Sequence, residues 1–340
     1  MKLAFLYAGQ GSQHVGMGRD LYENYPAFRA VLDAAPVDFD LKQLCFEGPE
    51  EQLNDTRYTQ PCMVAFAAGM TALLAERGIV PAAAAGLSLG EYCALHAAGV
   101  FDTDTAVELV AFRGKAMEEA AAGRPSAMVA VLGLDRAALQ EACDEASAHG
   151  CVVIANYNCP GQLVLGGEKA AVETAAALAK EKGARRCLPL KVSGPFHTPL
   201  MAPAGDALAE RFRTVEFREP QIPVIFNCLG AERPDGAAIP ELLVRQVQSS
   251  VYMEDSLRRM AAMGLDALVE AHDETEVEMA LDVGAKIVGV NNRDLKTFQV
   301  DMQNSIRLRN LAPREVLFVS ESGIKGPEEI SILREHPAGG

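Results

Sequence analysis

One serine of this chain stands in a pattern that is typical of a reactive nucleophile. Ser88 lies between two glycines in GLSLGEY, residues 86 to 92, which is a G-x-S-x-G pattern. Small flanking residues let the chain turn sharply from a strand into a helix and leave the serine hydroxyl exposed at the turn. The same pattern also occurs in ordinary glycine-bordered turns, so the surrounding elements must decide between the two interpretations.

The elements expected around Ser88 favour the nucleophile. AAAAGLS precedes it as a strand, although alanine prefers helices, and EYCALHAAGV follows as a helix. The apolar run at residues 3 to 8 predicts a buried strand that ends in the glycine loop of AGQGSQ. A helix is expected over residues 20 to 35, and a largely buried helix over 59 to 78, with Pro61 near its start.

A serine hydroxyl is a weak nucleophile until a base takes its proton, and among the six histidines His197 stands out as that base. It lies in VSGPFHTPLM, where Pro195 and Pro199 stiffen an irregular segment. His96 and His149 fit packed or solvated positions better. A loop histidine can also be structural, so the residue pattern leaves both roles open for His197.

Further groups of an acyl-transfer site can be assigned around Ser88. The N–H of Leu89, directly after the serine, and the N–H of Gln10, in the first glycine loop, are candidate donors to a developing oxyanion. Arg113 lies on the otherwise apolar helix VELVAFRGKAMEEA. Its planar guanidinium suits bidentate binding of a carboxylate, or it is a solvated residue at the helix edge.

Composition limits the class of protein. The chain has 340 residues, 36.3 kDa and 49% apolar residues, enough for about two domains with a substantial core. A net charge of -15 argues against a general affinity for nucleic acid or anionic membrane, so an anionic ligand needs a local basic pocket. Eight scattered cysteines without a C-x-x-C pair, and no signal peptide, predict a reduced cytoplasmic protein. No spacing indicates metal ligands or a redox cofactor.

Residues 125–192 follow a different pattern from the rest. Four short apolar strands alternate with two alanine-rich helices in the order β-α-β-β-α-β. This is the ferredoxin-like arrangement. It predicts a small subdomain inserted into a larger α/β unit.

Taken in order, the motifs of residues 1 to about 264 closely resemble those of bacterial malonyl-CoA:acyl carrier protein transacylases. The shared motifs are GQGSQ with GMGRDLY, TQP, GLSLGEY, RGKAM, NYNCPGQLVLGG, SGPFHTPLM and LVRQV. The resemblance implies an α/β-hydrolase-like core with a parallel sheet, formed by residues 1–124 and 193–264. It also implies an acyltransferase of fatty acid biosynthesis, whose substrate is a coenzyme A thioester and which needs no cofactor. The malonyl group would pass from malonyl-CoA to the phosphopantetheine thiol of acyl carrier protein through a malonyl-serine intermediate.

The resemblance also implies roles for individual positions. Ser88 matches the nucleophile and His197 the base, while the N–H groups of Gln10 and Leu89 match the oxyanion hole. Arg113 matches the residue that pairs with the free carboxylate of malonyl.

Three more positions carry implied roles. Asn156 and Gln162 fall in a stretch near the substrate pocket, and Gln246 matches a position whose main-chain carbonyl orients the histidine. A Ser-His dyad oriented in this way needs no aspartate. Leu87 replaces a histidine that many family members carry before the serine, and we expect activity to survive this change.

From about residue 264 to 335 the chain instead resembles the later part of indole-3-glycerol-phosphate synthase, a tryptophan-pathway (β/α)₈ enzyme, through GVNNRDL and SESGI. The resemblance places Asn291, Glu321 and Ser322 with Gly323 at the substrate end of the barrel. The segment offers about three of eight barrel strands, and the catalytic lysines and final phosphate loop are missing. We therefore expect residues 265–340 to be a non-catalytic fragment, of which 267–283 could complete the transacylase core.

The sequence leaves two other functions open. One is a non-catalytic or destabilised fusion protein that only binds carrier protein, and the other is a serine thioesterase that passes the acyl group to water. Five cations, Lys180, Lys182, Arg185, Arg186 and Lys191, form either a local basic surface for coenzyme A phosphates or carrier protein, or a solvated charged face.

Overall fold

The computed structural model describes residues 2–265, 268–282, 285–292, 299–322, 324 and 326–335. The chain divides into two compact units, the first comprising residues 3–260 and the second beginning at residue 261. The sequence motifs predict this boundary a few residues later, at about 264. Each unit is a mixture of helices and strands with its own buried apolar cluster.

A short parallel sheet lies at the centre of the first unit. Strand β1 (Ala4–Tyr7) pairs in parallel with β2 (Ala83–Gly86), and Ala84 of β2 bridges Val224 on its other side. All four residues of β2 are buried. Alanine and glycine form a strand here, against their propensity, because the tightly packed interior around this strand accommodates only small side chains.

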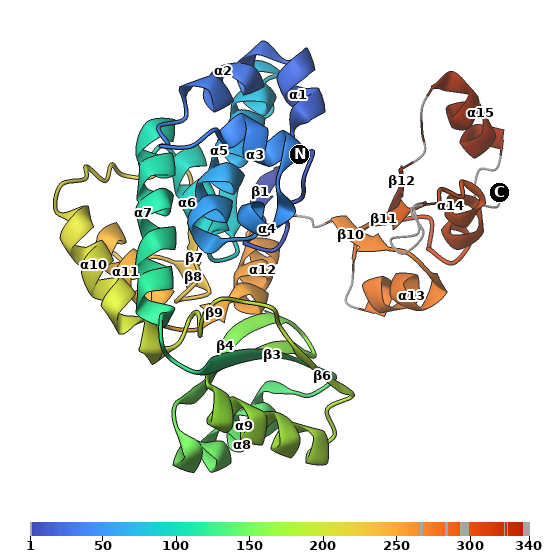
Figure 1. Cartoon of the computed structure of the whole chain (residues 1–340). Coiled ribbons are helices and arrows are strands. Elements are labelled where there is room, and N and C mark those ends of the chain that lie inside the picture. Colours follow the sequence, from blue (N-terminus) through green and yellow to red (C-terminus); the bar gives the residue numbers. More distant parts are fainter. Residues whose placement is uncertain are drawn as a thin grey trace. The chain divides into compact units, whose positions relative to one another are not determined.

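Helices surround this sheet (Figure 1). They are α1 (Arg19–Asn24), α2 (Pro26–Ala34), α3 (Leu41–Glu47), α4 (Glu50–Leu53), α5 (Thr56–Glu76), α6 (Gly90–Ala97), α7 (Thr103–Ala121), α10 (Ala202–Phe212), α11 (Ile239–Val247) and α12 (Met253–Ala262). The short elements that complete the unit are the 3₁₀ turn η2 (Pro199–Met201) and the hairpin of β7 (Ile225–Phe226) and β8 (Ala231–Glu232).

The single helix expected over residues 20 to 35 is two helices in the structure. Tyr25 has φ -128° and ψ 109°, which is extended backbone, and it ends α1 and precedes α2. The residue before a proline is disfavoured in helical conformation, and Pro26 follows Tyr25. The helical sequence pattern therefore continues across a break that one proline causes.

The long helix α5 packs against α7 in the core (Figure 1). By length and composition alone α5 could cross a membrane, since its most apolar window has a mean hydropathy of 1.2. More than half of that window, 56%, is buried inside the protein. The apolar surface of α5 is thus used for internal packing, and its amino-terminal turns face the candidate active site.

The inserted subdomain contains β3 (Ser126–Leu132), α8 (Arg136–Ala146), η1 (Ser147–His149), β4 (Val152–Cys159), β5 (Gln162–Glu168), α9 (Lys169–Glu181) and β6 (Arg186–Pro189). Its strands are ordered β6-β3-β5-β4, and β9 (Val251–Tyr252) of the larger part pairs in parallel with β4 at the sheet edge. Helices α8 and α9 cover one face of this sheet (Figure 1). The subdomain is therefore joined to the larger part through a shared sheet.

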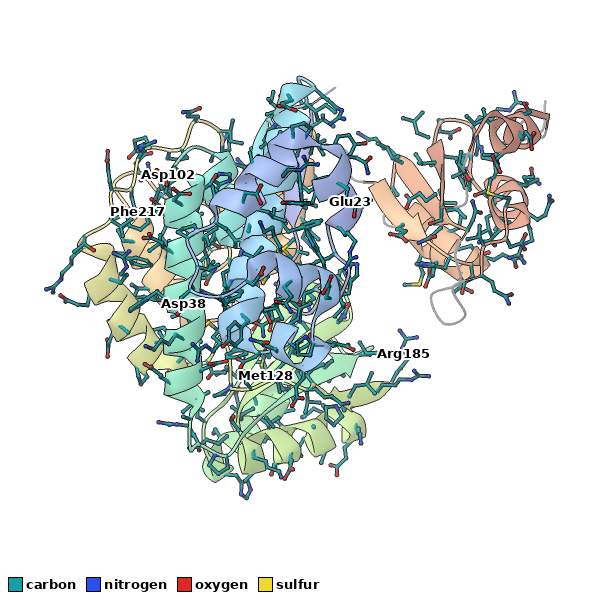
Figure 2. All side chains as sticks on the ribbon, turned by 45° about the horizontal axis from the view of Figure 1, so that its top comes forward. Glu23, Asp38, Asp102, Met128, Arg185 and Phe217 are labelled. Atoms are coloured by element: carbon teal, nitrogen blue, oxygen red, sulfur yellow. The ribbon has the colours of Figure 1, made fainter. Side chains whose placement is uncertain are left out.

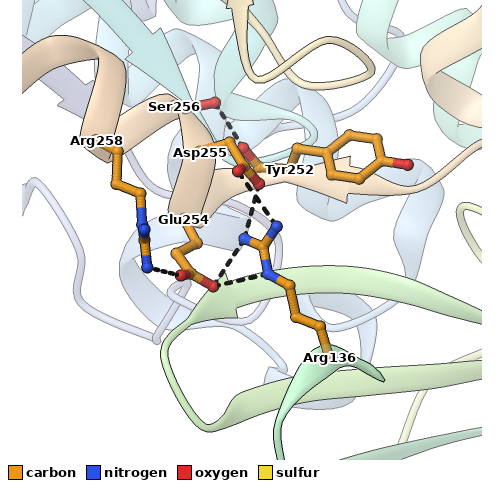
Figure 3. Close-up of polar contacts among 6 residues, drawn as sticks. All are labelled: Arg136, Tyr252, Glu254, Asp255, Ser256 and Arg258. Carbon is orange, nitrogen blue, oxygen red and sulfur yellow. Dashed lines mark hydrogen bonds and ion pairs between the residues drawn. The ribbon is translucent and has the colours of Figure 1, made fainter. Parts of the chain in front are cut away.

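Arg136 reinforces this junction (Figure 3). Its guanidinium lies between two carboxylates of α12, with Nη2 at 2.7 Å from both Glu254 Oε2 and Asp255 Oδ2. The same guanidinium stacks over the Tyr157 ring at 4.8 Å, and Tyr157 in turn stacks on Tyr252 with ring centroids 4.9 Å apart. Charged and aromatic contacts thus hold the start of α8 to the start of α12.

The second unit is a β-α-β-α-β arrangement followed by a helix. It contains β10 (Leu268–Ala271), α13 (Glu274–Asp282), β11 (Ile287–Asn291), α14 (Gln303–Arg309), β12 (Leu317–Glu321) and α15 (Pro327–Glu335). The three strands form one parallel sheet in the order β10-β11-β12. The expectation that residues 267–283 could complete the transacylase core therefore differs from the structure, because the sheet that contains β10 consists of β10, β11 and β12 among the described strands. Residue 267 lies outside the described residues.

Candidate active site

Ser88 stands at a tight turn between β2 and α6. Its φ of 53° is in the left-handed region, which costs a residue with a side chain about 1–3 kcal/mol. The flanking glycines are required by space: a Cβ at Gly86 would lie 2.0 Å from the Gly90 carbonyl carbon, and a Cβ at Gly90 would lie 2.3 Å from the Tyr7 oxygen. Glycine is thus required at both flanking positions for β1, β2 and α6 to meet so closely here.

His197 lies in position to act as the base of Ser88. The serine Oγ is 2.7 Å from His197 Nε2, and Nδ1 of the same ring is 2.9 Å from the main-chain oxygen of Gln246. A carbonyl oxygen only accepts, so Nδ1 carries the proton and Nε2 accepts from the serine. Burial, together with the positive charge of Arg113, lowers the pKa of His197 to about 4. The imidazole is therefore a neutral base at physiological pH.

Arg113 of α7 lies beside the same serine and is only 1% exposed. Its Nη2 donates to Ser88 Oγ at 3.1 Å and to Gln246 Oε1 at 3.0 Å, and Nη1 donates to Gln60 Oε1 at 3.0 Å. These partners are uncharged, and none of the ion pairs between described residues includes Arg113. A buried cation without an anion is costly, so this site is arranged to receive a negative charge.

Two backbone N–H groups are placed where they could bind an oxyanion. Leu89 and Gln10 both line the cavity in front of Ser88. Within the described chain neither N–H donates a hydrogen bond, so both are available to a ligand. The Gln10 side chain donates to Thr56 Oγ1 at 3.0 Å, which fixes the glycine loop against the start of α5.

The cavity that contains these groups has a volume of about 190 Å³ and lies between the larger part and the subdomain. Apolar side chains form most of its wall, among them Leu87, Met117, Met128, Val164 and Phe196. The strand β4 contributes Asn156 and Asn158, and Oδ1 of Asn158 is buried without a hydrogen-bond partner. A polar substrate group can therefore be recognised on the subdomain side.

The structure brings together all of the predicted site residues except one. Gln162 is exposed at the start of β5, where its Oε1 lies 3.4 Å from Cys159 Sγ. It is not part of the described cavity wall, although it shares a sheet face with Val164, because Gln162 pairs with Leu132 at the outer end of the ladder between β3 and β5. Its predicted contact with substrate has no counterpart in this arrangement.

Sequence reasoning missed three residues of the site. Gln60 holds Arg113 and lies in the shared motif TQP, to which the sequence alone assigns no role. Asn227 and Glu91 lie beneath the serine turn, where Asn227 accepts from Ser88 N–H at 2.6 Å and its own N–H donates to Glu91 at 2.5 Å. Burial raises the pKa of Glu91 to about 8. No local pattern signals Asn227, because its partners are far away in sequence.

A family model described as the acyl transferase domain matches residues 4–312. The chain belongs to this family. The acyl transferase is 40% identical over 310 residues to the malonyl CoA-acyl carrier protein transacylase of Bacillus subtilis, covering 90% of this chain and 96% of that one. Over 272 residues it is 42% identical to the protein of the same name from Escherichia coli, covering 79% and 88%.

Solved structures agree with this membership. The acyl transferase matches a Streptococcus pneumoniae structure named MCAT with a TM-score of 0.76 and 37% identity, covering 98% of this chain and 99% of that one. It also matches a malonyl-transacylase solved with a type II PKS acyl-carrier protein, with a TM-score of 0.73, 33% identity, and coverage of 98% and 100%.

The family match extends further than the sequence motifs indicated. It continues to residue 312, well past residue 264, where the resemblance to indole-3-glycerol-phosphate synthase begins. The matches give no support to that second resemblance. The mixed α/β fold, by contrast, agrees with the solved structures across nearly the whole chain.

Proposed function

We propose that this chain transfers the malonyl group of malonyl-CoA to the phosphopantetheine thiol of acyl carrier protein, in fatty acid biosynthesis, through a malonyl ester of Ser88. The observation that carries the proposal is the buried guanidinium of Arg113. Its Nη2 lies 3.1 Å from Ser88 Oγ, and two neutral glutamine oxygens hold it in place. Its relatives from Bacillus subtilis and Escherichia coli are named for this reaction.

The reaction has two halves, and the same groups around Ser88 act in both. His197 Nε2 takes the hydroxyl proton as Oγ attacks the thioester carbonyl, and the N–H groups of Gln10 and Leu89 stabilise the oxyanion. The C–S bond then breaks, and protonated His197 gives its proton to the leaving coenzyme A thiolate. In the second half the carrier thiol gives its proton to His197 and attacks the ester carbonyl; the bond from this carbon to Ser88 Oγ breaks, and His197 returns the proton to Oγ.

Arg113 provides the preference for a charged acyl group. A carboxylate two carbons from the thioester carbonyl pairs with the guanidinium when the carbonyl lies at Ser88 Oγ. An acetyl group fills the same position without neutralising the buried charge. An uncharged acyl group is therefore disfavoured, because its complex leaves the buried cation unpaired.

Labelling with radioactive malonyl-CoA tests the proposal. We expect stoichiometric label on Ser88 that a carrier thiol removes and water does not, and no label on Ser88→Ala. The absence of label from the folded protein would support a protein that only binds its carrier. Rapid release of label to water would instead identify a thioesterase.

The specificity role of Arg113 is a separate prediction. In Arg113→Ala the ratio of malonyl to acetyl transfer should fall by about a hundredfold or more, because the charged partner of the carboxylate is removed. The ratio of kcat/KM for the two coenzyme A thioesters measures it. Lys115→Ala, an exposed change two residues further along α7, is the matched control. An unchanged ratio in Arg113→Ala would remove Arg113 from substrate selection.

For the carrier protein, we propose a docking surface at the rim formed by β6 and the segment after it. Arg185, Arg186 and Lys191 are exposed there, and the Arg185 side chain extends away from the ribbon (Figure 2). Leu190 and Val192 of the same segment are partly exposed and also line the cavity. Lys182 is less available, since it pairs with Glu141 and Glu145. A basic rim offsets the overall charge of -15 for an anionic partner.

We further propose an α/β-hydrolase-like core, catalysis without a cofactor, and a cytoplasmic location. The strand, serine turn and helix at β2 and α6 support an α/β-hydrolase-like core. Ser88, His197 and the N–H groups of Gln10 and Leu89 supply a nucleophile, a base and oxyanion donors, which supports catalysis by protein groups alone. All eight cysteines are free, which accords with a reduced cytoplasmic environment.

We propose that the second unit is a partial β/α barrel without synthase activity. Its three parallel strands alternate with helices, and Asn291 and Glu321 are register partners at the ends of β11 and β12. Ser322 follows directly, whereas Gly323 lies outside the described residues. A closed barrel of this type needs eight strands to assemble its site, so three strands supply only a fraction of it.

A further inference from the structure

Asn227 makes contacts that no reaction step described above uses. It follows β7 and is fully buried. Its Oδ1 accepts from the N–H of Ser88 at 2.6 Å, and its Nδ2 donates to the carbonyl oxygen of Gly86 at 2.6 Å. One side-chain amide thus bridges the two ends of the turn that carries the nucleophile.

The serine turn needs such a bridge because its backbone leaves the sheet. The ladder between β1 and β2 ends at Gly86, and the N–H of Leu87 still donates to Tyr7. The next donor, Ser88 N–H, belongs to neither the strand nor α6. A buried backbone group without a partner destabilises the fold, and the conformation of Ser88 is itself strained. A primary amide offers the donor and the acceptor that the turn lacks.

Asn227 is itself held on both sides. Its N–H donates to Glu91 Oε2 of α6 at 2.5 Å, and its carbonyl oxygen accepts from the N–H of Tyr252 in β9 at 2.8 Å. These two contacts fix its main chain between the helix after the nucleophile and the strand that joins the subdomain. The amide therefore has little freedom to move away from the turn.

We propose that Asn227 is a positioning residue that holds Ser88 in the strained conformation in which Oγ faces His197 and the Leu89 N–H faces the cavity. Asn227 does not line the cavity, so it acts through Ser88 and contacts no substrate. The inference rests on the proposed role of Ser88 as nucleophile. Its test therefore uses an uncharged sulfonyl fluoride, which reacts with an activated serine and does not require Arg113, malonyl or a carrier.

Asn227→Asp is the decisive variant because it nearly preserves shape and changes only one hydrogen-bond donor. An ionised carboxylate cannot donate to Gly86 and faces its carbonyl oxygen, whereas a protonated carboxyl restores one donor and one acceptor. Burial and the adjacent Glu91 both favour the protonated form, so the change of state falls within an accessible pH range. The positive charge of Arg113, which also lowers the pKa of Glu91, instead favours the ionised form of the introduced carboxyl. Cys228 also interacts with Glu91, and burial keeps its thiol neutral.

We expect the rate of Ser88 modification in Asn227→Asp to be about ten- to a hundredfold below wild type at pH 8. At pH 5 the ratio of the two rates should return toward one. Comparison at each pH cancels the titration of His197, which both proteins share. A purely structural role would lower the melting temperature without making this ratio depend on pH.

Two further variants complete the experiment. Asn227→Ala should be slow at both pH values, and it gives the result if Asn227→Asp does not fold at pH 8. Asn24→Asp makes the same chemical change at the exposed end of α1 and should match wild type throughout. A ratio near one for a folded Asn227→Asp or Asn227→Ala at pH 8 would overturn the inference. A wild-type protein that the reagent does not modify would instead overturn the proposed nucleophile.

Discussion

At the scale of single residues, the state of His197 decides whether Ser88 is activated. Burial is the main cause of its low pKa, and the nearby Arg113 charge adds to it. The unfolded chain binds this proton near pH 6.5 and the folded chain only near pH 4. Above pH 6.5 the histidine is neutral in both states. As the pH falls from 6.5 toward 4, the unfolded state gains the proton first, so the free energy of unfolding decreases.

The same shift predicts an unusually acidic limit for the reactivity of Ser88. The rate of modification by a sulfonyl fluoride should fall with a midpoint near pH 4, because only then does the base of Ser88 become protonated. In Arg113→Met the midpoint should move to higher pH, since one cause of the shift is removed. Arg29→Met, an exposed change on α2, should leave it in place. A wild-type midpoint near 6.5 would contradict the burial argument.

At the scale of elements, the contact between α8 and α12 sets how the subdomain meets the rest of the first unit. Arg136 is about one-third exposed, but its partner Glu254 is only 7% exposed. The strand β4, which carries Asn156 and Asn158 into the cavity, is paired to β9 immediately beside this contact. We therefore expect substrate binding to depend on this junction, although it is distant from the reacting atoms.

We expect Arg136→Ala to lower the free energy of unfolding by about 1–2 kcal/mol, since a largely buried carboxylate loses a partner and Tyr157 loses its stacked cation. The KM for malonyl-CoA should rise more than kcat falls, because the cavity wall shifts while the Ser88 turn does not. Urea unfolding and steady-state kinetics measure the two effects. Lys169→Ala, in an exposed pair on α9, should change neither. Equal effects of the two substitutions would argue against a role of Arg136 in holding the start of α8 to the start of α12.

At the scale of the whole molecule, the two units have separate apolar clusters. In the first unit one cluster surrounds β2 and α5 and another fills the inserted subdomain, while the cluster of the second unit includes Ala271, Val288 and Leu308. Every group assigned to the reaction lies at or before Gln246, within the first unit. The family model matches the chain up to residue 312, so it also covers part of the second unit.

A chain that ends after residue 264 tests whether the first unit is sufficient. This truncation retains α12 and every proposed catalytic group, so the folded product should be labelled on Ser88 at the rate of the full chain. Labelling and circular dichroism measure the result. The full-length chain is the control for expression and solubility. A truncated chain that is insoluble or unlabelled would show that the second unit is required for the fold of the first.

Local sequence determines much of the candidate site because its chemistry depends on short-range geometry. Gly86 and Gly90 are needed at fixed distances from Ser88 to avoid backbone collisions, so the turn is visible as a five-residue pattern. The apolar run at residues 3 to 8 predicts β1 but not its burial, since Leu6 is 50% exposed, and α5 begins at Thr56, before the predicted start, so that Pro61 lies inside it. The resemblance to a family then decides between the roles that the residue pattern leaves open for His197 and Arg113, and it adds Gln246.

Only the tertiary structure decides the rest, because the relevant contacts join distant parts of the chain. Asn227 meets Gly86 and Ser88 across about 140 residues, and Gln60 meets Arg113 from another helix. The tautomer of His197 follows from a carbonyl 49 residues away. Gln162 and β10 show the limit of this reasoning. The motif that contains Gln162 and the apolar run that forms β10 are clear in the sequence, but the residues they contact are not. Spatial partners depend on how strands pair and helices pack, and a single sequence does not record those choices.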